Sequence, residues 1–197
     1  MTETLRLAAE GVFYTIQGEG YHAGEPSIFI RLAGCSVGCK QCDTNYRFHM
    51  IETVGRIVDH CLSLKQRHSG RPTMVWVTGG EPTDQNLEPL RMSLWNSGFK
   101  PALATSGVRA VKGLWAWLSV SPHSGAFAQR IGSELKLVPR LNGLDVFGMD
   151  LSGLQFPYLY CQPLAKNPTS LNDCLRFVEK YPRFKLTRQM HKEWGLP

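Results

Sequence analysis

Short apolar runs alternate along the chain with longer segments of helical period. The short runs are rich in β-branched and aromatic residues and are bounded by glycine, proline or polar residues, which is typical of strands. They lie at residues 11–16, 27–32, 74–78, 101–105, 134–138, 157–162 and 184–188. In three other segments apolar residues recur at intervals of three and four, which predicts amphipathic helices over 53–64, 86–97 and 170–181.

Each predicted helix has one apolar face that we expect to be buried. These faces contain Val54, Ile57, Val58, Cys61 and Leu62 on the first helix, Leu87, Leu90, Leu94 and Trp95 on the second, and Leu171, Cys174, Leu175 and Val178 on the third. We therefore expect Cys61 and Cys174 to be small core residues. Thr169 or Ser170 is the expected N-cap of the third helix, because a hydroxyl can accept a hydrogen bond from the first turn.

Strands that alternate with helices favour an α/β fold with a mainly parallel sheet and right-handed crossovers. The length of 197 residues suits one domain, and we expect residues 1–197 to form it. In such sheets ligands bind at the carboxyl ends of the strands. GCSVGCKQCDT follows the strand 27–32, GGEP follows 74–78, and SG follows 101–105. We therefore expect these three stretches to meet at one edge of the sheet.

The chain shows no targeting or membrane signal. No apolar run approaches the ~20 residues that a membrane-spanning helix needs, and the N-terminus has no signal-peptide pattern. We expect a cytoplasmic protein with no membrane partner. The 22 Lys and Arg exceed the 16 Asp and Glu, for a net charge of +6. An anionic partner would suit this charge, but the basic residues are scattered, as on an ordinary solvated surface, and we expect no direct contact with nucleic acid.

Three of the six cysteines, Cys35, Cys39 and Cys42, lie within eight positions. Six cysteines are too few for a disulfide scaffold of this length, so the cluster indicates metal binding or catalysis. A closed structural zinc site takes four protein ligands, and these three cysteines have no obvious second pair of ligands nearby. Three thiolates suit a [4Fe–4S] cluster whose fourth iron binds an exogenous chelating ligand.

The spacing CxxxCxxC resembles the signature of the radical S-adenosylmethionine superfamily, and TGGEP at 78–82 resembles its glycine-rich strand end. Further stretches resemble one family, the 7-carboxy-7-deazaguanine synthases of queuosine and 7-deazapurine biosynthesis. They are VFYTIQGEG (12–20), GEPSIFIRLAGC (24–35), CDT (42–44), TSG (105–107), VSP (120–122), ELK (134–136), QPL (162–164) and HKEWGLP (191–197). The resemblance runs nearly end to end and implies a partial, reduced (β/α)6-type radical barrel.

The resemblance also implies a reaction. Family members are lyases that convert 6-carboxy-5,6,7,8-tetrahydropterin to 7-carboxy-7-deazaguanine with loss of ammonia. They use a [4Fe–4S] cluster, S-adenosylmethionine and Mg²⁺, and the reactive species is a radical derived from the cofactor rather than a catalytic side chain. A homodimer and an electron donor such as flavodoxin are implied as partners.

The implied site residues fall into four groups. Cys35, Cys39 and Cys42 would hold the cluster, and Thr44 would bind Mg²⁺. The residues that would bind S-adenosylmethionine are Gln41, Cys42, Asp43, Gly80, Ser121, Pro122 and His123. The residues that would bind the pterin are Ile16, Gln17, Gly18, Arg31, Thr78, Gln162, Pro163, Leu164, Ala165, His191 and Pro197. Structural alternatives remain for three of them: Arg31 as a surface strand residue, Gln17 as a satisfied loop amide and His191 as a helix-end or core histidine.

Two positions depart from the family pattern. Ala104 stands where a carboxylate usually precedes the T-N/S-G motif, and His123 stands where a lysine usually follows S-P. A carboxylate can accept hydrogen bonds from the guanidine-like edge of a pterin, whereas alanine cannot. Glu134 and Asp145 are candidates to supply this acceptor, or the substrate differs.

Two other functions remain open. An activase that makes a glycyl radical on a partner protein would share the cysteine loop, but it lacks the TIQGEG stretch. A basic nucleic-acid-binding module with a zinc-stabilised loop would bind zinc and show salt-dependent affinity, and it has no use for TGGEP.

Overall fold

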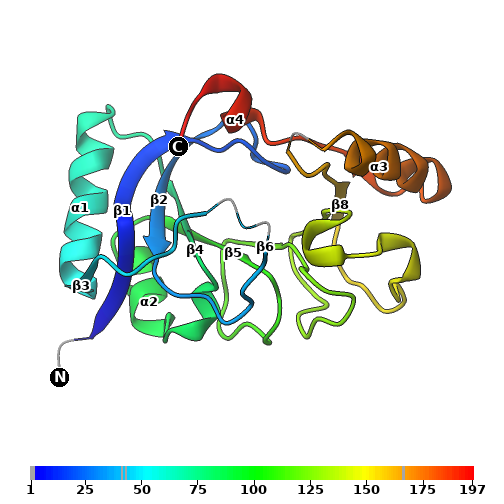
Figure 1. The fold of residues 1–197 in the computed structure, drawn as a ribbon. Coiled ribbons are helices and arrows are strands. Elements are labelled where there is room, and N and C mark those ends of the chain that lie inside the picture. The colour runs from blue at the N-terminus through cyan, green and yellow to red at the C-terminus, as the bar shows by residue number, and fades with distance from the viewer. Residues whose placement is uncertain (1–2, 41, 43, 166) are drawn as a thin grey trace.

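The fold is an open, mostly parallel sheet flanked by helices (Figure 1). The computed structural model describes residues 3–40, 42, 44–165 and 167–197. In these residues the sheet has nine strands in the order β3-β1-β2-β4-β5-β6-β7-β8-β9. The strands are β1 (Thr4–Ile16), β2 (Pro26–Leu32), β3 (Met50–Thr53), β4 (Met74–Gly79), β5 (Lys100–Thr105), β6 (Trp117–Val120), β7 (Glu134–Leu137), β8 (Tyr158–Cys161) and β9 (Lys185–Leu186).

Neighbouring strands from β2 to β9 pair in parallel, whereas β1 pairs antiparallel with both β2 and β3. The strand order ends at β3 and at β9, so the barrel is open. The predicted α/β fold, a partial barrel with a mainly parallel sheet, is therefore confirmed.

Four α-helices flank the sheet in the described part of the chain. They are α1 (Val54–Arg67), α2 (Glu88–Asn96), α3 (Pro168–Lys180) and α4 (Met190–Trp194), and the short 3-10 turns are η1 (Pro82–Asp84), η2 (Leu141–Gly143) and η3 (Val146–Gly148). In Figure 1, α1 lies beside β1 at one end of the sheet, α3 lies beside β8 at the other, and α4 bridges the space between them. Among the described residues, no helix combines the length and apolar character needed to span a membrane.

The two faces of the sheet have different roles because strand side chains alternate. One face of β2, β4 and β5 is buried with residues of α1 and α2; it contains Ile28, Ile30, Leu32, Val75, Val77 and Leu103. The intervening residues border a cavity on the opposite face; they are Phe29, Arg31, Trp76, Thr78 and Ala104. The apolar core therefore holds the strands in register while their other face is free to bind a ligand.

A second core cluster lies where α3 packs on β7 and β8. It includes Leu135, Leu137, Cys161, Cys174 and Phe177. Cys61 and Cys174 are both fully buried, which confirms them as core residues. Two adjoining clusters thus stabilise the two ends of the open sheet.

Several element boundaries differ from the prediction. β3, β6 and α4 were not predicted, and β1 begins at Thr4 rather than at residue 11. Gly11, with φ +56°, lies at a register shift between Leu7 and Val12, so the apolar pattern of β1 is interrupted there. The unpredicted elements have four or five residues, which is too short for a periodic pattern.

The prediction for α3 was partly wrong. Asn167 is its N-cap, since the side chain accepts from the Ser170 N–H at 2.9 Å and Pro168 occupies the first turn. Leu171 and Leu175 are exposed, at 40 % and 42 %. The helix buries a narrower face at Ser170, Cys174 and Phe177 because it packs against the end of the sheet. Leu62 of α1 and Trp95 of α2 are likewise exposed rather than buried.

Candidate functional site

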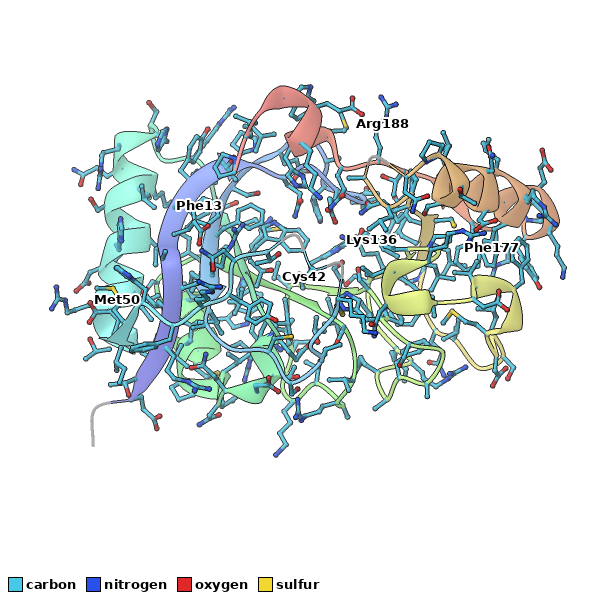
Figure 2. The ribbon with its side chains drawn as sticks, in the orientation of Figure 1. Phe13, Cys42, Met50, Lys136, Phe177 and Arg188 are labelled. Atoms are coloured by element: carbon cyan, nitrogen blue, oxygen red, sulfur yellow. The ribbon has the colours of Figure 1, made fainter. Side chains whose placement is uncertain are left out.

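The three cysteines of the loop after β2 line one pocket at the carboxyl ends of the parallel strands. This pocket, the thiol pocket, has a volume of about 220 Å³ and is lined by Cys35, Cys39, Cys42, Gly80, Ser121, His123 and Gln162, among others. GGEP and TSG therefore meet the cysteine loop at one edge of the sheet, as their positions after predicted strands indicated. SPH, which follows the unpredicted strand β6, lies at the same edge. All three thiols are free, and Figure 2 shows Cys42 near the centre of the molecule.

The loop that follows β2 and carries the three cysteines, the cysteine loop, is hydrogen-bonded to η1. The Ser36 N–H donates to Asp84 Oδ2 at 2.7 Å, and Ser36 Oγ donates to Asp84 Oδ1 at 2.8 Å. Arg109 forms an ion pair with the same carboxylate. The Glu81 N–H donates to the Gly34 carbonyl at 3.1 Å. The loop that carries the thiols is thus anchored on the stretch that follows β4.

Glu81 ties the end of β4 to the end of β5. Its carboxylate is 2 % exposed. Oε1 accepts from the Thr83 N–H, from Thr83 Oγ and from Thr105 Oγ, and Oε2 accepts from the Ser106 N–H and from Ser106 Oγ. Five donors around one buried carboxylate hold the GGEP and TSG stretches at a fixed separation.

Gly79 and Gly80 let β4 end directly against β2. A Cβ at Gly79, where φ is +137°, would overlap with the Leu32 backbone, and a Cβ at Gly80 would overlap with the Gly34 carbonyl oxygen. Any larger residue would push the cysteine loop away from the strand. The two glycines therefore allow close packing of β4 and the stretch after it against the backbone of β2 and the cysteine loop.

Cys39 is the predicted cluster ligand whose pKa is shifted. Its pKa is raised, first by burial and then by the neighbouring Cys42 and Cys35 thiols. His123 Nδ1 lies 3.0 Å from Cys39 Sγ. Within the described residues there is no set of three or more His, Cys, Asp or Glu side chains arranged around a single ion.

The thiol pocket has the features that an iron–sulfur cluster and its chelating ligand require. Three thiols on one loop offer the ligation that such clusters use. Gln162 Oε1 is buried and has no hydrogen-bond partner among the described residues, so the pocket presents an unsatisfied acceptor to a ligand with donors. The residues present therefore fit a [4Fe–4S] cluster with S-adenosylmethionine.

A second pocket of about 330 Å³, the inner pocket, lies along the inner faces of β2, β4 and β5. The predicted pterin-binding residues that line it are Ile16, Gln17, Gly18, Arg31, Thr78, His191 and Pro197. Thr44, Thr78, Ala104, Glu19, Lys136 and Gln189 line both pockets. The two pockets are therefore contiguous, and Thr44, the predicted Mg²⁺ ligand, lies at their junction.

Arg31 borders the inner pocket and has one hydrogen-bond donor without a partner among the described residues. It pairs with Thr78 across β2 and β4 in the sheet register. Its Nε is buried without a partner in the described structure, while Nη1 lies 3.4 Å from Glu10. Its guanidinium lies 5.2 Å from the centre of the Phe13 ring. Arg31 is therefore a half-buried cation with a free donor rather than a surface strand residue.

The C-terminal segment closes the inner pocket. The Met190 N–H donates to the Gly18 carbonyl at 2.9 Å, which docks α4 on the turn after β1. A Cβ at Gly18 would overlap with His191, so this contact needs glycine. Gln17 is 7 % exposed, and its side-chain oxygen accepts from the Glu19 N–H at 3.1 Å. Pro197, the last residue, thereby reaches the pocket lining.

A buried ion pair lies where the two pockets meet. Lys136 Nζ is 2.5 Å from Glu19 Oε2, and Gln189 Nε2 donates to Glu19 Oε1 at 2.7 Å. Burial raises the pKa of Glu19, but Lys136, Gln189 and His191 outweigh it and lower this pKa to about 2. Burial lowers the pKa of Lys136, but Glu19 and Glu134 outweigh it and raise that pKa. Both groups are therefore charged at neutral pH, and Figure 2 shows Lys136 directed to the same central space as Cys42.

The chain is similar along most of its length to known proteins. No protein-family model matches the chain. A protein named 7-carboxy-7-deazaguanine synthase from Flavobacterium psychrophilum is 37 % identical over 99 % of this chain and 94 % of its own length. Its namesake from Bacteroides thetaiotaomicron is 32 % identical over 92 % of this chain and 93 % of its own.

The chain belongs to the 7-carboxy-7-deazaguanine synthase family. Membership confirms the predicted resemblance and makes the chain an enzyme of the radical S-adenosylmethionine type. A crystal structure of QueE from Escherichia coli, which is 24 % identical, superposes with a TM-score of 0.70 and covers 95 % of both chains. That likeness shows a common fold.

Some of the residues expected from the family pattern lie elsewhere. Gln162 borders the thiol pocket rather than the inner one. Pro163 and Ala165 line a separate groove of about 670 Å³ between α3 and β9, and Leu164 borders both this groove and the thiol pocket. Pro122 is buried beside Ser121. Gln41 and Asp43 lie outside the described residues.

The two candidate replacements for the missing carboxylate at Ala104 are both engaged elsewhere. Glu134 is 1 % exposed, and its Oε2 accepts from the Tyr21 N–H at 2.9 Å. Asp145 caps η3 by accepting from the Phe147 N–H at 3.0 Å. Neither lines the thiol pocket or the inner pocket. Glu19 is the carboxylate side chain of the described residues that borders both.

Glu19, Lys136 and Gln189 were not predicted as site residues, although all three border both pockets. Glu19 lies in QGEG and Lys136 in ELK. The inward alternation of β7, with Glu134 and Lys136 on the face of Tyr158 and Tyr160, was the available signal.

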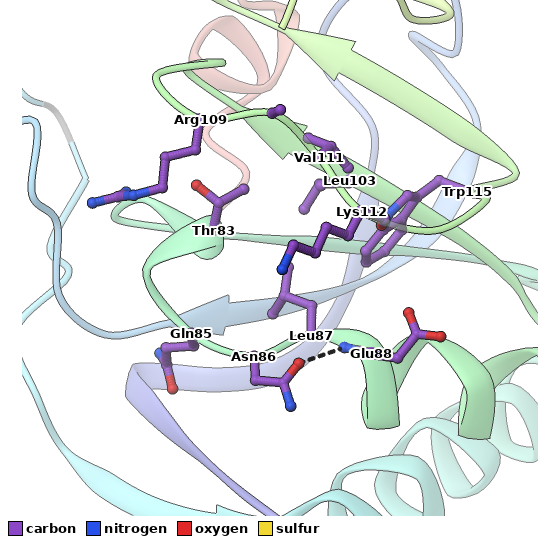
Figure 3. A pocket seen from close by; sticks show the side chains of 11 residues that line it. Thr83, Gln85, Asn86, Leu87, Glu88, Leu103, Arg109, Val111, Lys112 and Trp115 are labelled. Carbon is purple, nitrogen blue, oxygen red and sulfur yellow. Dashed lines mark hydrogen bonds between the residues drawn. The ribbon is translucent and has the colours of Figure 1, made fainter. Parts of the chain in front are cut away.

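A further cavity of about 510 Å³ lies outside the barrel, between α2 and the loop that follows β5 (Figure 3). Asn86, Arg109, Lys112 and Trp115 are among its lining residues. Its link to the site is indirect, because Arg109 also donates to Ser36 Oγ on the cysteine loop at 3.2 Å.

Proposed function

We propose that this enzyme converts 6-carboxy-5,6,7,8-tetrahydropterin to 7-carboxy-7-deazaguanine with loss of ammonia. The observation that carries the proposal is the continuity of the thiol pocket with the inner pocket through Thr44, Thr78 and Ala104. A [4Fe–4S] cluster reduced by one electron, together with S-adenosylmethionine, would supply a 5′-deoxyadenosyl radical for hydrogen abstraction from the substrate. A substrate held in the inner pocket would lie next to this chemistry.

The residues of the thiol pocket would bind the two cofactors. Cys35, Cys39 and Cys42 would ligate the cluster as thiolates. Gly80, after β4, and Ser121, after β6, would contact S-adenosylmethionine, and His123 would lie beside it. Gln162 Oε1 supports this assignment, because it is buried without a partner among the described residues and could accept a hydrogen bond from a ligand.

The residues of the inner pocket would hold the pterin. Arg31 would pair with the substrate carboxylate, because its Nε is unpartnered and a guanidinium matches a carboxylate in geometry. Gln17 and His191 would line the ring, and Pro197 would border it from the C-terminal segment. Thr44 would offer its hydroxyl to Mg²⁺, a hard ion that keeps few protein ligands and completes its shell with substrate oxygens and water.

A second candidate substrate is favoured by Ala104. This residue borders both pockets without offering an acceptor to a guanidine-like edge. Glu19 would supply the acceptor, since each of its oxygens keeps a lone pair beyond the bonds to Lys136 and Gln189. If Glu19 does not do so, a related pterin without that amino edge is the better substrate.

The remaining expectations belong to the same proposal. The enzyme would be one domain over residues 1–197, would act as a cytoplasmic homodimer, and would take its electron from a donor such as flavodoxin. No direct contact with nucleic acid or membrane is part of it.

An anaerobic assay tests the proposal. The reconstituted protein would be mixed with S-adenosylmethionine, Mg²⁺, dithionite and 6-carboxytetrahydropterin, and 5′-deoxyadenosine and 7-carboxy-7-deazaguanine would be followed by mass spectrometry. Both products are expected from the wild type and from Cys61→Ala, a buried thiol outside the site, and neither from Cys42→Ala. Deoxyadenosine alone would favour the second candidate substrate. A zinc-loaded protein that forms neither product would refute both.

A further inference from the structure

His123 lies against one cluster ligand of the thiol pocket. Its Nδ1 is 3.0 Å from Cys39 Sγ, although 84 residues separate the two in sequence. The backbone here is hydrogen-bonded at two points, since the Ser121 N–H donates to the Thr105 carbonyl at 2.8 Å and Asn142 Nδ2 lies 3.5 Å from the His123 carbonyl oxygen. Pro122 between them is buried. The imidazole is therefore presented to the sulfur by a well-held strand end.

The chemistry of a ligated thiolate assigns the direction of this contact. A cysteine that binds iron carries no proton, so its sulfur can act only as an acceptor. An imidazole nitrogen 3.0 Å away is attractive to such a sulfur only if that nitrogen carries the hydrogen. Nδ1 of His123 would then be the donor when the cluster is bound.

We propose that His123 donates an Nδ1–H···Sγ hydrogen bond to Cys39 and thereby raises the reduction potential of the iron–sulfur cluster. The inference rests on the cluster assignment in the proposed function. Reduction adds an electron to the cluster, and a donor at a ligating sulfur stabilises that extra negative charge more in the reduced state than in the oxidised state. His123 is thus a positioning residue that acts through Cys39, in a chain whose family pattern has lysine at this position.

The reduction potential itself is the measurement. Reconstituted wild-type protein and variants would be titrated anaerobically, with the reduced cluster followed by electron paramagnetic resonance and no S-adenosylmethionine or substrate present. His123→Ala should make reduction about tenfold less favourable, which is ~59 mV for one electron. His123→Asn keeps an N–H near the position of Nδ1 and should recover most of the shift. His60→Ala, at an exposed position of α1, is the matched control and should leave the potential unchanged.

A second readout separates a hydrogen bond from direct ligation of iron. Protein labelled with ¹⁵N-histidine should show a weak nitrogen coupling to the reduced cluster, and this coupling should be lost in His123→Ala. A strong coupling typical of an iron–nitrogen bond would overturn the proposal, as would a potential in His123→Ala equal to that of the wild type. If His123→Ala fails to hold iron, the wild-type coupling and the Asn variant still decide the question.

Failure of this inference can be told apart from failure of the proposed function. The potential is read without substrate, so a normal shift in a protein that makes no 7-carboxy-7-deazaguanine would leave the inference intact. Normal turnover with no shift in potential would refute the inference alone. A wild-type chain that binds no iron–sulfur cluster would refute both.

Discussion

Replacement of Glu81 by glutamine would test how the site edge of the sheet is held together. The Glu81 carboxylate is buried and accepts from five donors, of which three are on Oε1 and two on Oε2. A glutamine of the same size keeps one oxygen, but its NH₂ group cannot accept. If the oxygen faces Thr83 and Thr105, the Ser106 N–H loses its acceptor.

The expected loss of stability follows from the hydrogen bonds that the variant cannot make. The Ser106 hydroxyl can turn to accept from the new amide, but its N–H, in a residue that is 7 % exposed, stays unpaired. An unsatisfied buried donor costs ~1–3 kcal/mol, and replacing charge-assisted bonds by neutral ones adds ~1 kcal/mol. We therefore expect Glu81→Gln to lower the free energy of unfolding by ~3 kcal/mol. At ~2–4 °C per kcal/mol for a chain of this size, the midpoint temperature of thermal unfolding should fall by about 6–12 °C.

Urea unfolding of the wild type, Glu81→Gln and the exposed control Glu179→Gln, followed by far-UV circular dichroism at pH 7, measures this effect. The control should stay within ~0.5 kcal/mol of the wild type. The reasoning is refuted if Glu81→Gln unfolds at the same urea concentration as the control, because Glu81 would then not be the acceptor that joins the two strand ends.

Three further changes probe the same region. Glu19 has a pKa depressed to about 2, so its contribution to stability is present above pH ~4.5 and is lost as the pH falls toward 2. In urea unfolding at stepped pH, Glu19→Gln should therefore reduce by ~3 kcal/mol the loss of unfolding free energy over this pH range. An unchanged loss would contradict the paired state with Lys136. Asp84→Ala removes two hydrogen bonds to Ser36 and should lower the iron content after reconstitution severalfold, whereas full iron loading would show that the loop needs no such anchor. Ala104→Glu restores the family carboxylate and should lower KM for 6-carboxytetrahydropterin about tenfold; a raised KM would mean that this pocket has been shaped for another ligand.

The cysteine loop and most strands could be predicted because their signals are local. Cys35, Cys39 and Cys42 need only their spacing to indicate a three-thiolate site, and strands such as β4 and β8 appear as apolar runs of the right length. β3 and β6 escaped detection because four residues do not establish a period. The N-cap of α3 was missed because Thr169, Ser170 and Asn167 are all acceptable caps in sequence.

The sequence by itself determined the family, the candidate thiol ligands and the mainly parallel sheet, since each depends on short motifs or on the order of elements along the chain. The tertiary structure alone decided which distant groups meet. Glu19 contacts Lys136 across 117 positions and Gln189 across 170, and His123 reaches Cys39 across 84. These pairings depend on strand register and on how the open sheet brings its two ends toward one cavity, and no local pattern of residues encodes that geometry.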